Sequence, residues 1–267
     1  MRTVLMCHAD DAFDRQGLAA WLASFSDLAG LVLIEETGEQ KRARVRRELK
    51  RVGPWRFLDV LAMRFYYRFR LAAADNAWMG ERLGDLRARF NDVAGVPELR
   101  VSSANAPEVA RFLAACEPDL MIARSKQLLS KRIYRVPRHG CLVMHPGICP
   151  EYRNAHGCFW ALAERDLDKV GLTLLRIDAG IDTGPIYGYY TYPFDEANES
   201  HVRVQYRVVL DNLDALAQRM RDIVAGTARP IDVAGRPSGV WGQPWLSRYL
   251  RWKRAARTAA PAAVAAE

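Results

Sequence analysis

The residues best suited to chemistry are a histidine and an aspartate that follow two apolar runs. His145 comes directly after the run 141–144, and Pro146, which cannot donate a ladder hydrogen bond, should end a strand there. A second apolar run, 171–177, leads into a loop rich in glycine and acidic residues that contains Asp182, about 37 residues after the histidine. If the two strands are neighbours, the carboxylate can orient and charge the imidazole, which suits proton transfer.

A sheet must position these two residues, and the apolar pattern of the chain predicts one. Strand-like runs alternate with segments of helical period, and the order strand–helix–strand implies parallel strands joined by right-handed crossovers. We therefore expect an α/β fold, a Rossmann-like and mostly parallel sheet with helices on both faces. The predicted strands lie at 3–7, 28–34, within 96–105, and at 120–123, 141–144, 171–177 and 188–193.

Two kinds of site are not expected. The turn after the first strand, 8–11, lacks both Gly-x-Gly-x-x-Gly and Gly-Lys-Ser/Thr, which argues against dinucleotide and Walker-type phosphate sites. Cys149, Cys158, His145 and His156 invite a zinc interpretation, but their spacing fits no common ligand pattern. The sequence therefore predicts no metal.

The stretch 140–187 resembles the formyltransferases that take a one-carbon unit from 10-formyltetrahydrofolate. That family shows Asn-x-His-Pro-Ser/Gly-x-x-Pro-x-Tyr-Arg-Gly, a Trp-containing helix, Gly-x-Thr, and then Asp-x-Gly-x-Asp-Thr-Gly. The matching residues here are His145, Pro146, Gly147, Pro150, Tyr152, Arg153, Trp160, Gly171, Thr173, Asp178, Gly180, Asp182, Thr183 and Gly184.

The resemblance implies a formyltransferase fold, 10-formyltetrahydrofolate as co-substrate, and roles for particular residues. His145 would donate to the oxyanion of an acyl transfer, and Asp182 would hold it or relay protons. Tyr152 and Arg153 would contact the acceptor, although Arg153 could equally clamp its loop. The residues expected around the folate are Leu128, Leu129, Asp178, Gly180, Ile181 and Thr183.

Two positions depart from the family pattern, and both lie in the expected site. The usual Asn two residues before the histidine is Val143, and the Gly after Tyr-Arg is Asn154. Valine cannot donate a hydrogen bond. One alternative is therefore a non-catalytic or altered relative that serves in binding or at a membrane. The other is that Asn154 or His156 supplies the missing donor, and we count both among the candidate catalytic residues.

Composition bounds the class of protein and of partner. The chain has 267 residues, a net charge of +8 and a pI near 9.4, which suggests an anionic substrate, a nucleic acid or an acidic membrane without choosing among them. Its five cysteines show no disulfide spacing. We identify no signal peptide and no apolar stretch of transmembrane length, and we expect a cytoplasmic protein, with the periphery of the inner membrane as the alternative.

The segment 41–70 is dense in arginine and interleaved with aromatic residues. It predicts two helices broken at Gly53-Pro54, one solvated and one packed on the sheet. The alternatives are a basic amphipathic segment that lies on an anionic membrane or grips a lipid-linked or polyanionic substrate, and a nucleic-acid site.

The remaining expectations concern domains and the acceptor. We expect a catalytic domain at 1–190 with a helical insertion at about 41–90. A C-terminal extension, 191–267, should add a long helix from Glu199 to Gly226 and a disordered end from Ala255. The favoured acceptor is a small-molecule amine, a sugar amine first and an amino-acid-type amine second. Initiator tRNA is a poor candidate because the pattern after 191 shows no β-barrel, and a homodimer stays open.

Overall fold

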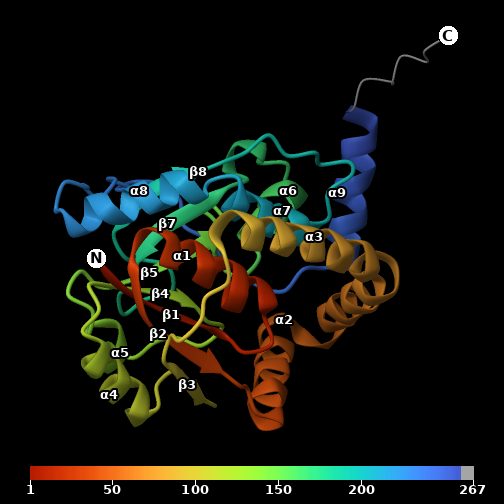
Figure 1. Ribbon diagram of the computed structural model, residues 1–267. Coiled ribbons are helices and arrows are strands. Elements are labelled where there is room, and N and C mark those ends of the chain that lie inside the picture. The colour runs from red at the N-terminus through yellow and green to blue at the C-terminus, as the bar shows by residue number, and fades with distance from the viewer. Residues whose placement is uncertain (260–267) are drawn as a thin grey trace.

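The computed structural model describes residues 1–259 and is built around one seven-stranded sheet (Figure 1). The strand order is β3-β2-β1-β4-β5-β7-β8, parallel from β3 to β5 and antiparallel at β7 and β8. The expected α/β fold with a mostly parallel sheet is confirmed. The strands are β1 (Arg2–His8), β2 (Asp27–Ile34), β3 (Glu98–Val101), β4 (Leu120–Arg124), β5 (Cys141–Pro146), β7 (Leu172–Arg176) and β8 (Ile186–Tyr190).

Helices cover both faces of the sheet, as the sequence predicts. Side chains alternate along β1: Leu5 and Cys7 join one apolar cluster, whereas Val4 and Met6 join another. The second cluster is closed by α4 (Pro107–Cys116) and α5 (Lys131–Tyr134). The first, larger cluster is closed by η1 (Phe13–Leu18), α1 (Ala19–Phe25), α3 (Ala72–Phe90), α6 (Gly157–Ala163), η3 (Leu167–Lys169), α7 (His201–Leu210), α8 (Leu213–Val224) and α9 (Leu246–Ala259). Burial on both faces explains why the central strands read as unbroken apolar runs.

A helical arm, made of α2 (Gly38–Tyr66) and η2 (Tyr67–Leu71), leads from β2 into α3 and lies against α9 (Figure 1). The expected break is present, because Gly53 has a φ of 78° and separates two helical stretches. The second stretch is packed, as expected, but only on one side. Val60 and Met63 are buried, but Trp55 is 83% exposed. The stretch thus carries apolar residues both on the side that is buried against the protein and on the side that faces solvent.

The segment after β8 differs from the expectation in two places. The single long helix is two helices, α7 and α8, which separate at Asn212. The amide of Asn212 donates to the carbonyls of Val208 and Thr191, an alternative to continued helix that asparagine favours. Residues 255–259 belong to α9 and are not disordered, and Ala256 is buried. The rest of the stretch expected to be disordered, 260–267, lies outside the described residues.

A second, two-stranded sheet joins β6 (Arg153–Asn154) to β9 (Val240–Trp241). We call the segment 236–245, which contains β9, the strap. No helix in residues 1–259 is both long and apolar enough to cross a membrane.

Candidate active site

The predicted histidine and aspartate lie next to each other. β5 and β7 are neighbours but antiparallel, so β7 ends opposite Leu142, at the far end of β5 from His145. The loop 177–185 must therefore run back toward the histidine, and it places the Oδ2 of Asp182 3.4 Å from His145 Nδ1. The other ring nitrogen, Nε2, lies 2.7 Å from the carbonyl oxygen of Tyr152. The buried imidazole is thus held at both nitrogens.

Hydrogen-bond bookkeeping defines what this pair can do. Both partners of His145 are acceptors, so only a doubly protonated ring can donate to both. Oδ2 of Asp182 also accepts the backbone N–H of Asn154 at 2.7 Å, while its second oxygen has no hydrogen bond to another described residue. Asp182 has a φ of 50°, a strained conformation of the kind that gathers at functional sites. The second oxygen is open to a proton, and the ring, when doubly protonated, can stabilise negative charge.

The residues expected around the folate gather at one cleft of about 100 Å³ beside this pair. Its wall includes Leu128, Leu129, Val143, Asp178, Gly180, Ile181 and Asp182. Thr183 does not line the cleft but supports it, since its hydroxyl donates to Asp178, which also accepts the N–H of Gly180. A Cβ on Gly180 would lie 2.0 Å from the Thr183 hydroxyl, so this turn requires glycine.

Tyr152 and Arg153, expected to contact an acceptor, have structural partners instead. The phenol of Tyr152 is buried and donates to Asp166 at 3.0 Å, and its ring stacks on Trp241. Arg153 Nη1 donates to the carbonyl of Ile181 at 2.9 Å, which clamps the loop that carries Asp182. This hydrogen bond supports the alternative in which Arg153 clamps the loop. The substrate role of the Tyr152 side chain is not supported, because its polar group faces the interior.

Asn154 and His156 differ in their capacity to replace the donor lost at Val143. The side-chain amide of Asn154 is used by the strap, where it donates to the carbonyl of Trp241. The side chain of Asn154 is therefore already engaged and is not a candidate oxyanion donor. Its backbone N–H positions Asp182.

His156 keeps a free donor. Its Nδ1 lies 3.3 Å from the amide nitrogen of Gln205, which must donate, so the proton of the neutral ring is on Nε2. Burial first, and then the charge of Lys126, lower the pKa of His156 to about 4. The ring is therefore neutral near pH 7, and its Nε2–H has no hydrogen bond to another described residue.

The strap holds the loop that carries these residues. Trp241 packs against Trp160, and its Nε1 donates to the carbonyl of Glu151 at 2.9 Å. Arg236 forms a salt bridge with Glu151 at 2.7 Å. At the other end of the strap, the N–H of Gln243 donates to Glu48 in the helical arm at 3.2 Å.

A second group of charged residues, to which the sequence analysis gave no role, lies where β1 and β4 end. Arg124 forms a buried ion pair with Asp14 at 3.0 Å and donates to the carbonyl of Met144, next to His145. The N–H of Lys126 points at Nε2 of His8 at 3.3 Å. Strand order reverses between β1 and β4, and the crevice outside such a point is the usual ligand position in α/β sheets. The polar run directly after the first strand, 8–11, was the signal.

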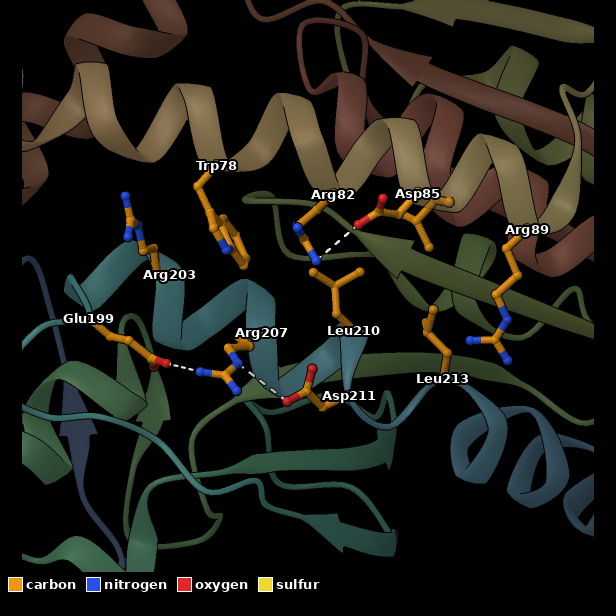
Figure 2. A pocket seen from close by; sticks show the side chains of 11 residues that line it. Trp78, Arg82, Asp85, Arg89, Glu199, Arg203, Arg207, Leu210, Asp211 and Leu213 are labelled. Carbon is orange, nitrogen blue, oxygen red and sulfur yellow. Dashed lines mark hydrogen bonds and ion pairs between the residues drawn. The ribbon is translucent and has the colours of Figure 1, made fainter.

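A larger cleft of about 530 Å³ between α3 and α7 is a different kind of place (Figure 2). In Figure 2, Arg82 pairs with Asp85 at 2.9 Å, and Arg207 pairs with Asp211 and Glu199. The other two arginines of its wall pair with acidic residues outside it, Arg89 with Asp214 and Arg203 with Asp75, and the cleft contains neither His145 nor Asp182.

Comparison with known proteins agrees with this geometry. A family described as formyl transferase matches residues 77–220, more than half of the chain. A methionyl-tRNA formyltransferase of Sorangium cellulosum is 33% identical over 100 residues, 37% of this chain and 32% of that protein. One of Geobacter metallireducens is 35% identical over 91 residues, 34% of this chain and 29% of that protein. The chain thus spans about a third of the length of these curated relatives.

Solved structures show the same fold. A glycinamide ribonucleotide transformylase from Symbiobacterium toebii gives a TM-score of 0.52 at 16% identity over 87% of this chain and 94% of its own. A sugar N-formyltransferase from Shewanella sp. gives 0.52 at 16% identity over 91% and 77%. A 4-N formyltransferase from Francisella tularensis gives 0.54 at 11% over 96% and 87%. With the His145–Asp182 pair at the end of β5 and the matched family pattern, the chain belongs to the formyl transferase family.

Proposed function

We propose that the protein is an N-formyltransferase that moves the formyl group of 10-formyltetrahydrofolate to an amino group of a small molecule. The observation that carries the proposal is the contact between His145 and Asp182 at the rim of the cleft lined by Leu128, Leu129 and the loop 178–182. A proton acceptor, a group that can carry positive charge and an apolar slot then lie within one site.

The heteroaromatic ring of the folate would occupy the cleft. Leu128, Leu129 and Val143 offer apolar surface, and the backbone of 178–182 offers polar groups opposite them. The folate would supply an activated formyl carbon and a nitrogen leaving group. No metal enters this proposal.

The residues of the chain supply proton handling. Acyl transfer to an amine develops negative charge on the formyl oxygen and releases a proton from the amine. As the amine bonds to the formyl carbon, the bond from that carbon to the folate nitrogen would break. The second oxygen of Asp182 would take the proton from the amine, and that proton would pass to the departing nitrogen. His145 stabilises the negative charge and, to donate to the oxygen directly, exchanges one of its two present acceptors. We propose that His156, whose Nε2–H has no hydrogen bond to another described residue, supplies the donor that Val143 lacks.

The acceptor would occupy the crevice outside β1 and β4. His8 and the exposed Lys126 border it, and a cation there favours an acceptor with an anionic group. A nucleotide-linked amino sugar is our first choice and an amino-acid-type amine the second. The two relatives described above are named for methionyl-tRNA, so our expectation against tRNA stays a prediction for the acceptor experiment.

A second candidate function follows from Val143. Its side chain packs with Leu175 and Ile186 in a small apolar cluster, so this strand position is adapted to an apolar residue. The alternative is a relative with altered or no transfer activity that still binds folate.

The experiment combines binding with transfer. Titration with 5-formyltetrahydrofolate, a stable analogue, should raise Tm or give a calorimetric signal. Incubation with 10-formyltetrahydrofolate and separate amino-sugar nucleotides, amino acids and methionyl-tRNA should add one formyl group to one class, read by mass spectrometry. Binding without transfer to any class would favour the second candidate. No binding at millimolar analogue would refute both.

A further inference from the structure

The outer face of the helical arm carries an apolar stripe that the fold leaves uncovered. The stripe consists of Trp55, Leu58, Phe65 and Phe69, which are 83%, 56%, 60% and 74% exposed. Their spacing of three, seven and four residues places them on one side of a helix. The opposite side, with Val60 and Met63, is already buried against the protein. The stripe therefore does not contribute to the hydrophobic core.

The arm also holds the positive charge of the chain. Residues 41–70 contain eleven Lys and Arg against two acidic residues, a net +9, whereas the whole chain carries +8; the other residues together are net −1. Arg64, Arg68 and Arg70 are exposed and form no ion pair with any residue from 1 to 259. Arg68 and Arg70 therefore place unpaired cations beside Phe65 and Phe69, whereas Arg64, four residues after Val60, lies on the other side of the helix.

A basic cleft lies beside the stripe, where the arm meets α9. It has a volume of about 710 Å³, and Tyr66 and Leu250 form part of its wall. Arg254 and Arg257 also line it, and neither pairs with an acidic side chain in the described part of the chain. Figure 1 shows α9 and the arm together at one edge of the molecule, away from α4 and α5. Apolar and cationic groups are therefore exposed on the same edge.

We propose that this edge, the apolar stripe with the basic cleft, binds the surface of an anionic lipid bilayer. Aromatic and leucine side chains on one helix face, flanked by arginines, match a helix that lies in the membrane interface. The stripe would enter the boundary between headgroups and acyl chains, and the arginines would meet lipid phosphates. The fold need not unpack, because the buried side of the same helix stays in place.

Two other occupants fit less well. In a two-fold dimer the same patch faces itself, so a second copy would bring one +9 segment against another. A single-stranded nucleic acid needs open aromatic faces for stacking. Here Leu58 has none, and the rings of Phe65 and Phe69 stack on each other, with centroids 6.4 Å apart and planes 5° from parallel.

Vesicle flotation tests the proposal with the full chain. Vesicles with about 30% phosphatidylglycerol in phosphatidylcholine should carry the protein at about 0.05 M salt and release most of it at about 0.5 M, because salt screens the attraction. Pure phosphatidylcholine vesicles should carry at least about tenfold less. Equal binding to both vesicle types, or none to either, would overturn the proposal.

Matched variants separate the stripe from general stickiness. Phe65→Ser with Phe69→Ser should weaken vesicle binding at least about tenfold, because apolar area no longer enters the interface. Leu49→Ser with Ile231→Ser, which also removes two exposed apolar residues, should leave binding unchanged. Equal loss in both pairs, with Tm unchanged in both, would overturn the assignment to the stripe.

Charge variants follow the same design. Arg64, Arg68 and Arg70, each changed to Glu, should abolish binding. Changing the exposed Arg111, Arg135 and Arg229 to Glu alters net charge equally and should reduce binding much less. Light scattering tests for a dimer, and an RNA-binding assay tests for a nucleic-acid partner. The membrane proposal would be replaced if the parent protein bound no vesicles but formed a dimer or an RNA complex, and if Phe65→Ser/Phe69→Ser abolished that assembly.

Discussion

Around His145, the side chains of His145, Asp182 and Arg124 have hydrogen-bond or ion-pair partners, whereas along the helical arm Arg64, Arg68 and Arg70 form no ion pair with another described residue. Asp182, His145 and Arg124 are each fixed by two or more contacts. Fixed groups suit chemistry, which needs geometry within a fraction of an ångström. Free cations suit a large anionic surface, which needs no single geometry. The predictions below test whether the two regions act as differently as they are built.

The largest effect is expected at the paired groups. His145→Ala and Asp182→Asn should each lower the rate of formyl transfer ~10²-fold or more, since each removes a proton-handling group. His139→Ala and Asp168→Asn are matched controls that should keep the parental rate. Circular dichroism checks that the fold survives. Full turnover in Asp182→Asn would move the role to Asp178.

His156 should matter more than Asn154. Losing one donor to an oxyanion costs ~10²–10³ in rate, and only His156 keeps an unused N–H. His156→Ala should therefore approach the loss in His145→Ala under single-turnover conditions, with Asn154→Ala losing less. The reverse order would return the donor role to Asn154. If Val143→Asn raised the rate instead, the altered-activity candidate would gain.

The stability of the fold should depend on pH through two histidines near the site, and the arm should not contribute to this dependence. Burial lowers the pKa of His156 to about 4 and that of His201 to about 3. Both histidines stay neutral in the folded state, whereas in the unfolded chain they take up protons near pH 6.5. The free energy of unfolding is therefore unaffected by them above that pH and decreases below it. Each histidine should cost about 3 kcal/mol by pH 4.

The measurement is Tm between pH 7.5 and 4.5. His201→Gln should flatten the decline, while Phe65→Ser/Phe69→Ser should leave its slope unchanged, because no residue from 41 to 70 is a histidine. A parental Tm that does not fall across this range would contradict the buried neutral state of both rings.

The smallest effect is expected from charge reversal in the first stretch of the arm. Arg46→Glu with Arg47→Glu should leave the affinity for 5-formyltetrahydrofolate unchanged within about twofold, since both side chains are exposed and unpaired among residues 1–259. Arg51→Glu should shift it slightly more, because Arg51 holds Glu48, the partner of the strap. Calorimetry measures both, and a large loss in the first variant would place the arm in the folate site.

Sequence reasoning succeeded where local pattern decides. The apolar runs of β1, β4, β5 and β7 follow from burial on both faces, and the break at Gly53 follows from its freedom at positive φ. The cleft residues from 178 to 182 came from the family resemblance, and the structure gathers them.

Distant partners decided the rest. Nothing near Asn154 in sequence announces that Trp241 uses its amide, or that Tyr152 points at Asp166. The separation of α7 from α8 depends on Thr191, which lies about twenty residues before Asn212. For the arm the sequence left a packed and an amphipathic alternative open. The structure buries Val60 and Met63 and leaves Trp55, Leu58, Phe65 and Phe69 exposed, because the core contacts only one side of the helix.

The strap gives the two regions a shared element. One end bonds to Glu48 in the arm; its β9 holds Asn154, whose backbone N–H fixes Asp182. A ligand that shifts the arm would therefore also shift the position of the Asp182 carboxylate. A coupling free energy between two sites is reciprocal. Under the membrane proposal, lipid acts as an effector. If binding to a bilayer changes the affinity for substrate by some factor, then binding of substrate changes the affinity for the bilayer by the same factor.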